Sequence, residues 1–149
     1  RSHKANIGSS LMYLLDTNVV SEFRKLGSSQ INSNVKIWAE DTDPDLMFVS
    51  SISILELEIG VLQVERRDKK QGQVLRKWLN KHVLPAFSER VLPVDLAVAL
   101  RCASLHVPNP KSERDAMIAA TAIEHRMTIV TRNIADFSQS GVKMFDPWR

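Results

Sequence analysis

Four acidic residues lie just after or beside short apolar runs, where a fold can gather them. Asp16 follows the run MYLL and Glu56 lies within ISILELEIG. Asp115 precedes the alanine-rich stretch AMIAATAI, and Asp136 follows the segment TIVTRNIA. Each acid alone has an ordinary explanation, as a helix cap, an exposed helix residue, a first-turn acid favoured by the helix dipole, or a loop residue. Together they indicate a carboxylate site.

A set of carboxylates in one crevice would need a cation, because their negative charges repel one another in a partly buried site. Carboxylate oxygens are hard ligands, and no histidine or cysteine stands at a matching spacing, so the set favours Mg²⁺ or Mn²⁺ over Zn²⁺. An ion held in this way, with open positions for water and phosphate, is suited to hydrolysing phosphodiester bonds. The candidate metal ligands are Asp16, Glu56, Asp115 and Asp136.

Alternating strands and helices must position these acids. Apolar runs predict strands at residues 12–15, 46–50, 91–94, 127–130 and near 142–145, and Pro93 indicates that the third is short or at an edge. Helical patterns cover residues 19–25, 35–40, 54 to about 65, 68–82, 96–106 and 113–125. This alternation predicts an α/β fold whose parallel sheet has helices on both faces. Ligands bind at the carboxyl ends of such strands, where the acids should converge.

Two helices have predicted buried faces. Along residues 54–65, Leu55, Ile59 and Leu62 are spaced to form the apolar face, with Glu56 beside it. Along residues 68–82 the expected buried stripe consists of Val74, Leu75, Trp78 and Leu79.

Size and composition are those of one globular domain. The chain has 149 residues, of which 44% are hydrophobic and 25% charged. Residues 1–11 are expected to be an expression-vector remnant, which leaves residues 12–149 as the domain. Without Arg1 and Lys4 the formal charge falls from +3 to +1, so net charge alone does not indicate a nucleic-acid partner.

The single cysteine and the lack of long apolar runs narrow the protein class further. Cys102 alone can form neither a disulfide framework nor a cysteine-based zinc cluster, which favours a reducing, cytoplasmic location. No apolar run approaches the roughly 18 residues of a membrane helix, so no membrane association is expected.

Several segments resemble the PIN-domain ribonucleases, and among them the VapC-type toxins of bacterial toxin–antitoxin modules, in particular the FitB-like branch. The resemblance spans residues 12–148 and is carried by the ordered segments LLDTNVVSEF (14–23), SSISILELEIGVL (50–62), VLPVD (91–95) and RDAMIAATAIEHRMTIVTRNIADF (114–137). It implies a three-layer α/β/α fold with a central parallel sheet of four to five strands. It also implies a metal-dependent endoribonuclease. Because no histidine or lysine is placed in the sequence as a base for the 2′-hydroxyl of RNA, metal-activated water is the expected nucleophile.

The resemblance assigns the family's acidic quartet to Asp16, Glu56, Asp115 and Asp136, and its supporting threonine to Thr131. It implies a homodimer and a cognate antitoxin that inhibits the active site. One departure is Arg126, where relatives usually have glycine in the turn between helix and strand.

A basic stretch offers a candidate contact for RNA phosphates. If its helix is continuous, the residues share one face; they are Arg66, Lys70, Lys77 and Lys81. The alternative is a solvated helix face, and only Trp78 supplies an aromatic ring within this stretch.

Two other functions remain open from the residues. Aspartyl-phosphate enzymes also place an aspartate after their first strand, but phosphatases usually show DxD there, whereas this chain reads Asp16-Thr17-Asn18. A non-catalytic PIN domain that binds RNA or a protein partner is distinguished by a lost acid, and all four acids are present.

Overall fold

A five-stranded parallel sheet forms the centre of the fold in the computed structural model, which describes residues 11–149. Its strands are β1 (Tyr13–Leu15), β2 (Met47–Ser50), β3 (Val91–Leu92), β4 (Thr128–Val130) and β5 (Met144–Phe145). They lie in the order β3-β2-β1-β4-β5, and every pairing is parallel. The central place of β1 puts Asp16, the residue after it, in the middle of the carboxyl edge.

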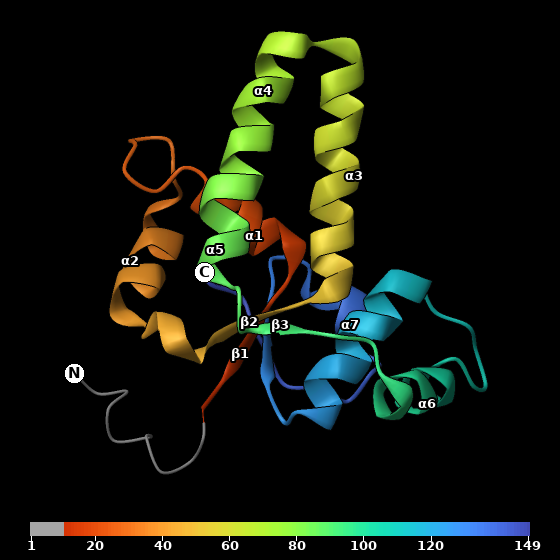
Figure 1. The fold of residues 1–149 in the computed structure, drawn as a ribbon. Helices are drawn as coiled ribbons and strands as arrows, with labels where there is room; N and C mark the ends of the chain where they lie inside the picture. The colour runs from red at the N-terminus through yellow and green to blue at the C-terminus, as the bar shows by residue number, and fades with distance from the viewer. Residues whose placement is uncertain (1–10) are drawn as a thin grey trace.

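Side chains that alternate along the strands build one core on each face of the sheet. Leu14 and Ile129 belong to one buried cluster, while their neighbours Leu15 and Val130 belong to the other. This alternation is the two-residue period of a strand buried on both faces. The predicted α/β class and three-layer arrangement are confirmed (Figure 1).

Helices cover both faces of this sheet. On the Leu15 face lie α1 (Thr17–Phe23), α2 (Ser33–Asp41) and most of α3 (Ser51–Arg67). The Leu14 face is covered by α7 (Glu113–Glu124), against which α6 (Leu96–Leu105) packs. Short 3₁₀ turns precede β2 and follow β4; they are η2 (Pro44–Leu46) and η4 (Ile134–Phe137).

A helical hairpin formed by α3 and α4 (Lys69–Trp78) extends away from the sheet (Figure 1). Asp68 ends α3 and caps α4 by accepting a hydrogen bond from the Gln71 N–H at 3.1 Å. The guanidinium of Arg76 holds the two helices together, since it donates to Glu58 at 2.7 and 2.9 Å and to Glu65 at 3.1 Å.

The helix predicted at residues 68–82 is present, but part of its expected buried stripe is wrong. After α4 the chain continues through the π-helix η3 (Leu79–Val83) into α5 (Leu84–Ala86). Leu79 is buried and Leu75 and Trp78 are half-buried, whereas Val74 is 55% exposed. Leu79 and Val83 lie in the same buried cluster as residues of the sheet and α3, and Leu75 and Trp78 pack against that cluster. The buried face of the helix therefore leaves out Val74.

The predicted face of α3 is also wrong. Leu55 and Leu62 are 45% and 51% exposed, whereas Leu57 and Val61 are buried. Helix α3 has apolar residues on two sides, and helical periodicity cannot decide which side faces the sheet. The helix presents Leu57 and Val61 to the core, which turns Glu56 towards α1.

The remaining element predictions agree with the structure to within about two or three residues at most boundaries. Strand β3 is short and lies at the sheet edge, as Pro93 indicated. Residues 1–10 of the expected vector remnant lie outside the described residues. None of the helices between residues 11 and 149 combines the length and the apolar composition that crossing a membrane requires.

Candidate active site

Asp16 is the most buried of the four predicted acids, with 7% of its surface exposed. It lies between β1 and α1 and caps the helix, since its Oδ1 accepts a hydrogen bond from the Thr17 N–H at 2.8 Å. The backbone N–H of Asp16 itself donates to the Val130 carbonyl at 2.9 Å. This position is therefore held by β4 as well as by its own helix, and the ordinary cap role coexists with a place in the acid site.

Thr131 orients the second oxygen of Asp16. The buried hydroxyl of Thr131 donates to Asp16 Oδ2 at 2.8 Å and accepts from the Asn133 N–H at 3.0 Å. Asn18 adds longer hydrogen bonds, from its Nδ2 to Asp16 Oδ2 at 3.3 Å and to Thr131 Oγ1 at 3.4 Å. The Arg132 N–H in turn donates to Asn18 Oδ1 at 3.3 Å. These hydrogen bonds tie the turn after β4 to the turn after β1.

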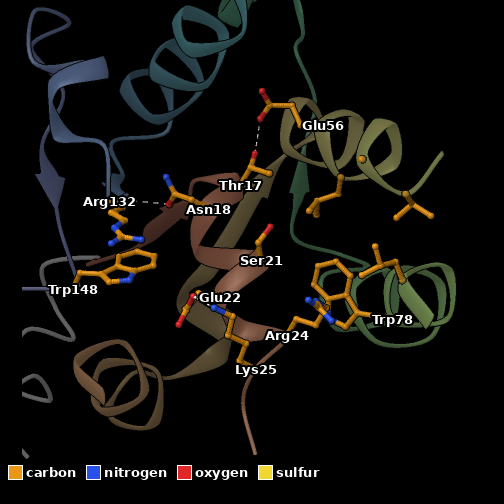
Figure 2. Close-up of a pocket in the computed structure, with 14 residues that line it drawn as sticks. Thr17, Asn18, Ser21, Glu22, Arg24, Lys25, Glu56, Trp78, Arg132 and Trp148 are labelled. Atoms are coloured by element: carbon orange, nitrogen blue, oxygen red, sulfur yellow. Dashed lines mark hydrogen bonds and ion pairs between the residues drawn. The ribbon is translucent and has the colours of Figure 1, made fainter. Parts of the chain in front are cut away.

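Glu56 faces α1 from the second turn of α3. The Thr17 hydroxyl donates to Glu56 Oε1 at 2.5 Å (Figure 2). The other carboxylate oxygen lies 3.8 Å from Arg114 on α7, whose side chain is half exposed. Glu56 is thus half-buried and partly balanced by a positive charge.

Asp115 and Asp136 complete the group of acids from α7 and η4. Asp115 is half-buried in the first turn of α7, and Asp136 is exposed in η4. Burial raises the pKa of Asp115, and the charges of Asp136, Asp16 and Glu56 raise that pKa further. A hydrogen bond with Ser112 offsets part of the rise. The other three predicted acids therefore lie close enough to Asp115 to oppose its ionisation.

The environment of Asp16 disfavours a charge in the same way. Burial is the largest cause that raises the pKa of Asp16, and the charges of Glu56 and Asp136 add to it. Hydrogen bonds from Thr131 and Thr17 lower this pKa and offset part of the increase. Two raised carboxyl pKa values in one cluster indicate an excess of negative charge that a cation would relieve.

The donor chemistry of this cluster fits a hard divalent cation. Its ligands are carboxylate oxygens, which Mg²⁺ and Mn²⁺ prefer. Among residues 11–149, however, no three His, Cys, Asp or Glu side chains are arranged closely enough to hold an ion together. The acids therefore influence one another electrostatically, but their side chains are not arranged so that all four could contact one metal ion directly, as the sequence suggested.

Two hollows flank the acids. A cleft of about 500 Å³ contains Glu56 and Thr17 at one end and runs between α1, α3 and α4 towards Trp148 near the C-terminus (Figure 2). A smaller hollow of about 130 Å³ contains Asp115 and Asp136, together with Lys111, whose ammonium donates to Gln139 at 3.0 Å. An extended substrate crossing the acid cluster would have space on both sides.

The predicted RNA-contact residues lie on the α3–α4 hairpin and its extension, and all are exposed; they are Arg66, Lys70, Lys77 and Lys81. They do not share one continuous helix face, because the chain reverses at Asp68 between Arg66 and Lys70. Arg76 is held by Glu58 and Glu65 instead of standing free.

Four residues around the acids make contacts that the sequence pattern does not predict. Thr17 and Asn18 have the residue types of a turn and a cap, yet both hydrogen-bond site residues through their side chains. Their position directly after Asp16 was the available signal. Arg114 and Arg132 have no such signal. Only the fold brings Arg114 on α7 to Glu56, and only the fold brings Arg132 in the turn after β4 to Asn18.

Comparison with known proteins agrees with this geometry. The sequence pattern of the PIN domain matches residues 13–141. Toxin FitB of Neisseria gonorrhoeae is 34% identical over 142 residues, covering 92% of this chain and 99% of FitB. VapC ribonuclease Y4jK of Sinorhizobium fredii is 31% identical over 142 residues, covering 92% and 98% of the two chains.

Solved structures give the same result. The crystal structure of FitAcB from Neisseria gonorrhoeae matches with a TM-score of 0.83 and 34% identity, covering 93% of this chain and 99% of that one. FitAB bound to a DNA fragment matches with a TM-score of 0.82 and 33% identity, covering 93% and 96%. The sheet order, the acids at its carboxyl edge and these similarities lead to one conclusion: the chain belongs to the PIN-domain family.

Proposed function

We propose that this protein is an endoribonuclease and the toxin of a bacterial toxin–antitoxin pair, active in the cytoplasm with Mg²⁺ or Mn²⁺. The observation that carries the proposal is the mutual repulsion of Asp16, Glu56, Asp115 and Asp136 at the carboxyl edge of the sheet. The names of the relatives support it, since one is called a toxin and another a VapC ribonuclease.

Asp16 and Asp115 are the side chains we expect to hold the cation. Both have raised pKa values, so both gain from a positive charge beside them. Both also lie at the ends of regular elements, Asp16 between β1 and α1 and Asp115 in the first turn of α7. A divalent cation held there supplies a Lewis acid that activates water at neutral pH and offsets phosphate charge.

The other site residues orient water and the acids. Glu56 accepts from Thr17 and lies near Arg114, so its carboxylate is fixed where it can accept a proton from a water molecule. Asp136 is exposed at the edge of the smaller hollow, and Thr131 keeps Asp16 in position. Among the described residues, neither hollow is lined by a histidine that would activate the 2′-hydroxyl of RNA, and the lysines that line them are engaged elsewhere, Lys25 with Glu22 and Lys111 with Gln139. Water is therefore the proposed nucleophile.

The proposed partners are RNA as substrate, a cognate antitoxin and a second copy of the chain. The solved complexes FitAcB and FitAB support the antitoxin, because both pair a similar chain with a second protein in their names. The homodimer rests on the family resemblance alone.

Cleavage of a defined RNA pool tests the activity. Wild type should cut with Mg²⁺ or Mn²⁺ and not with EDTA, and Asp16→Asn should lose several orders of magnitude in rate. The products should carry 5′-phosphate and 3′-hydroxyl ends, and a 2′-deoxy substitution at the cut site should affect only binding. A 2′,3′-cyclic phosphate, or near wild-type cleavage by Asp16→Asn, would contradict the proposal.

Thermal unfolding tests cation binding without relying on activity. Millimolar Mn²⁺ should raise the Tm of wild type, because the ion binds the native state preferentially. Asp16→Asn and Asp115→Asn should be at least as stable without metal and should lose most of the Mn²⁺ response. If both variants keep the full shift, the ion binds elsewhere.

A further inference from the structure

The cleft that contains Glu56 and Thr17 is also lined by positively charged and aromatic side chains. Its basic lining residues are Arg24, Lys25 and Arg132, against the acids Glu22 and Glu56. Two of the three tryptophans, Trp78 and Trp148, also line it. The sequence pattern gives aromatic support for RNA binding only at Trp78, because Trp148 is far away in the chain.

Arg132 and Trp148 form a cation–π pair at one side of this cleft. The guanidinium of Arg132 lies 5.2 Å from the centre of the Trp148 ring, and Figure 2 shows the two side chains together. Trp148 is half-buried and packs against the core, so its ring is held in place, whereas Arg132 is exposed. A guanidinium held over a ring in this way still has N–H groups available for a phosphate.

The other cations of the cleft differ in how strongly they are engaged. Lys25 forms an ion pair with Glu22 at 3.1 Å, and Glu22 also accepts from the Asn32 N–H at 2.8 Å. Within residues 11–149, neither Arg24 nor the Arg132 guanidinium has a carboxylate at ion-pair distance. Arg24 and Arg132 are therefore the cations best able to meet a new anion.

We propose that this cleft binds unpaired RNA next to the cleavage site, with Arg132 and Arg24 contacting phosphates, Trp148 holding Arg132 in place and Trp78 stacking on a base. This inference rests on the proposed function, since it places the substrate of that same site. Glu56 and Thr17 belong both to the cleft and to the acid cluster, so one nucleotide strand can reach from the rings to the acids. Stacking requires exposed base faces, which a duplex does not offer.

Direct binding measurements in EDTA separate this site from catalysis, because they keep the RNA intact. The probe is a fluorescein-labelled oligouridine of 12 nucleotides, with the same strand annealed to its complement as the duplex comparison. The full chain should bind the single strand at least ten-fold more tightly than the duplex. Bound RNA should quench tryptophan fluorescence, and replacing Trp78 by phenylalanine should reduce that quenching.

Matched charge variants locate the site. Arg24→Gln with Arg132→Gln should weaken binding of the single strand about ten-fold or more. The same double variant should reduce the slope of log Kd against the logarithm of salt concentration. The reduction should be about 0.7 for each phosphate that the protein no longer neutralises. Arg66→Gln with Lys70→Gln removes the same charge from the hairpin residues that the sequence offers as RNA contacts, and it should weaken binding much less than the cleft variant does. Arg132→Lys keeps the charge but not the planar guanidinium over Trp148, so it should keep the salt dependence and bind less tightly than wild type.

Three results would overturn the inference. They are equal weakening by the two double variants, equal binding of duplex and single strand, and unchanged tryptophan fluorescence on binding. The cleft would belong to a protein partner if its variants bound RNA normally but no longer bound a co-expressed antitoxin. RNA bound in the cleft by a protein that cleaves none with Mn²⁺ would refute the proposed function and leave this inference standing.

Discussion

Asp16 combines a helix-capping role with a place in the acid cluster. Its Oδ1 caps α1 through the Thr17 N–H, while its Oδ2 takes hydrogen bonds from Thr131 and Asn18. An aspartate used only as a cap would lie at the surface, where water solvates its charge. This one is 7% exposed beside other acids, so keeping it ionised costs free energy.

The pH dependence of stability should therefore change in Asp16→Asn. The folded-state pKa of Asp16 is raised above its ordinary value of 3.8, so its contribution to stability is greatest below that value and is lost as pH rises through the raised pKa. Asn cannot ionise, so the variant should gain stability relative to wild type across this window, as urea unfolding between pH 3 and pH 7 can show. Asp43→Asn is the matched control, since Asp43 is also a cap but is exposed. A parallel pH profile for wild type and Asp16→Asn would refute the expectation.

Thr131 should act as a positioning residue for Asp16. Thr131→Val keeps the shape but removes the hydroxyl that donates to Asp16 and accepts from the Asn133 N–H, at a cost of about 1–3 kcal/mol in unfolding free energy. The pKa of Asp16 should rise further, which should move the acid limb of the pH–rate profile to higher pH. Thr131→Ser should restore both properties. A loss of stability with an unmoved pH profile would reduce Thr131 to a purely structural role.

At the scale of elements, the turn between α7 and β4 places a non-glycine residue in a left-handed conformation. Arg126 has φ of 56°, so the turn geometry that glycine would adopt is kept despite the substitution. Arg126→Gly should stabilise the fold by about 0.5–1 kcal/mol, because the relief of backbone strain exceeds the entropy cost of glycine. Arg126→Ala removes the same exposed side chain without relieving the strain and should give no gain. Equal stability of the glycine and alanine variants, measured in urea, would contradict this account.

The α3–α4 hairpin depends on close packing at Gly72. A Cβ at this position would lie 2.6 Å from the Glu65 Cα, so Gly72→Ala should destabilise the protein by about 1–3 kcal/mol. Gly60→Ala is the control, since Gly60 is also helical but a Cβ there would meet nothing within 4 Å. That change should stabilise α3 by up to about 1 kcal/mol. Chemical denaturation of both variants tests the difference, and a tolerated Gly72→Ala would show that the helices can separate at little cost.

Element types followed from local patterns, whereas buried faces did not. Asp16, Ser50 and Asp95 cap the helices that follow strands, and aspartate and serine are residue types that helix caps prefer. The exposure of Leu55, Leu62 and Val74 was not predictable, because these residues fit an apolar helix face as well as the residues that are buried do. Which face is buried depends on the element that packs against the helix, and a single sequence does not identify that element.

At the scale of the whole molecule, the acid cluster was predictable and its surroundings were not. A parallel sheet brings strand ends to one edge, so acids after β1 and near the ends of β2 and β4 had to converge. The pairing of Arg132 with Trp148, and of Glu56 with Arg114, joins segments with no shared pattern. The acids also lack a ready three-carboxylate arrangement within residues 11–149, a detail of side-chain geometry beyond what spacing determines.

An inhibitory antitoxin should compete with metal. The acids attract cations, so we expect the antitoxin to insert an arginine or lysine beside Asp16 and Asp115. Calorimetry should then show weaker Mn²⁺ binding to the co-purified complex than to the toxin alone. Replacing the inserted residue by glutamine should restore Mn²⁺ binding. Full Mn²⁺ affinity in an inhibited complex would exclude this mode and leave steric cover of the RNA path.

The hydrogen bond between Asp16 and Thr131 spans 115 positions of the chain. Strand β1 is made first but finds β4 only after most of the polypeptide has left the ribosome, so the acid group cannot assemble on a partial chain. A nuclease built in this way would be inactive during its own synthesis. The interval between release and completion of the sheet is then the time in which a newly made antitoxin can reach it.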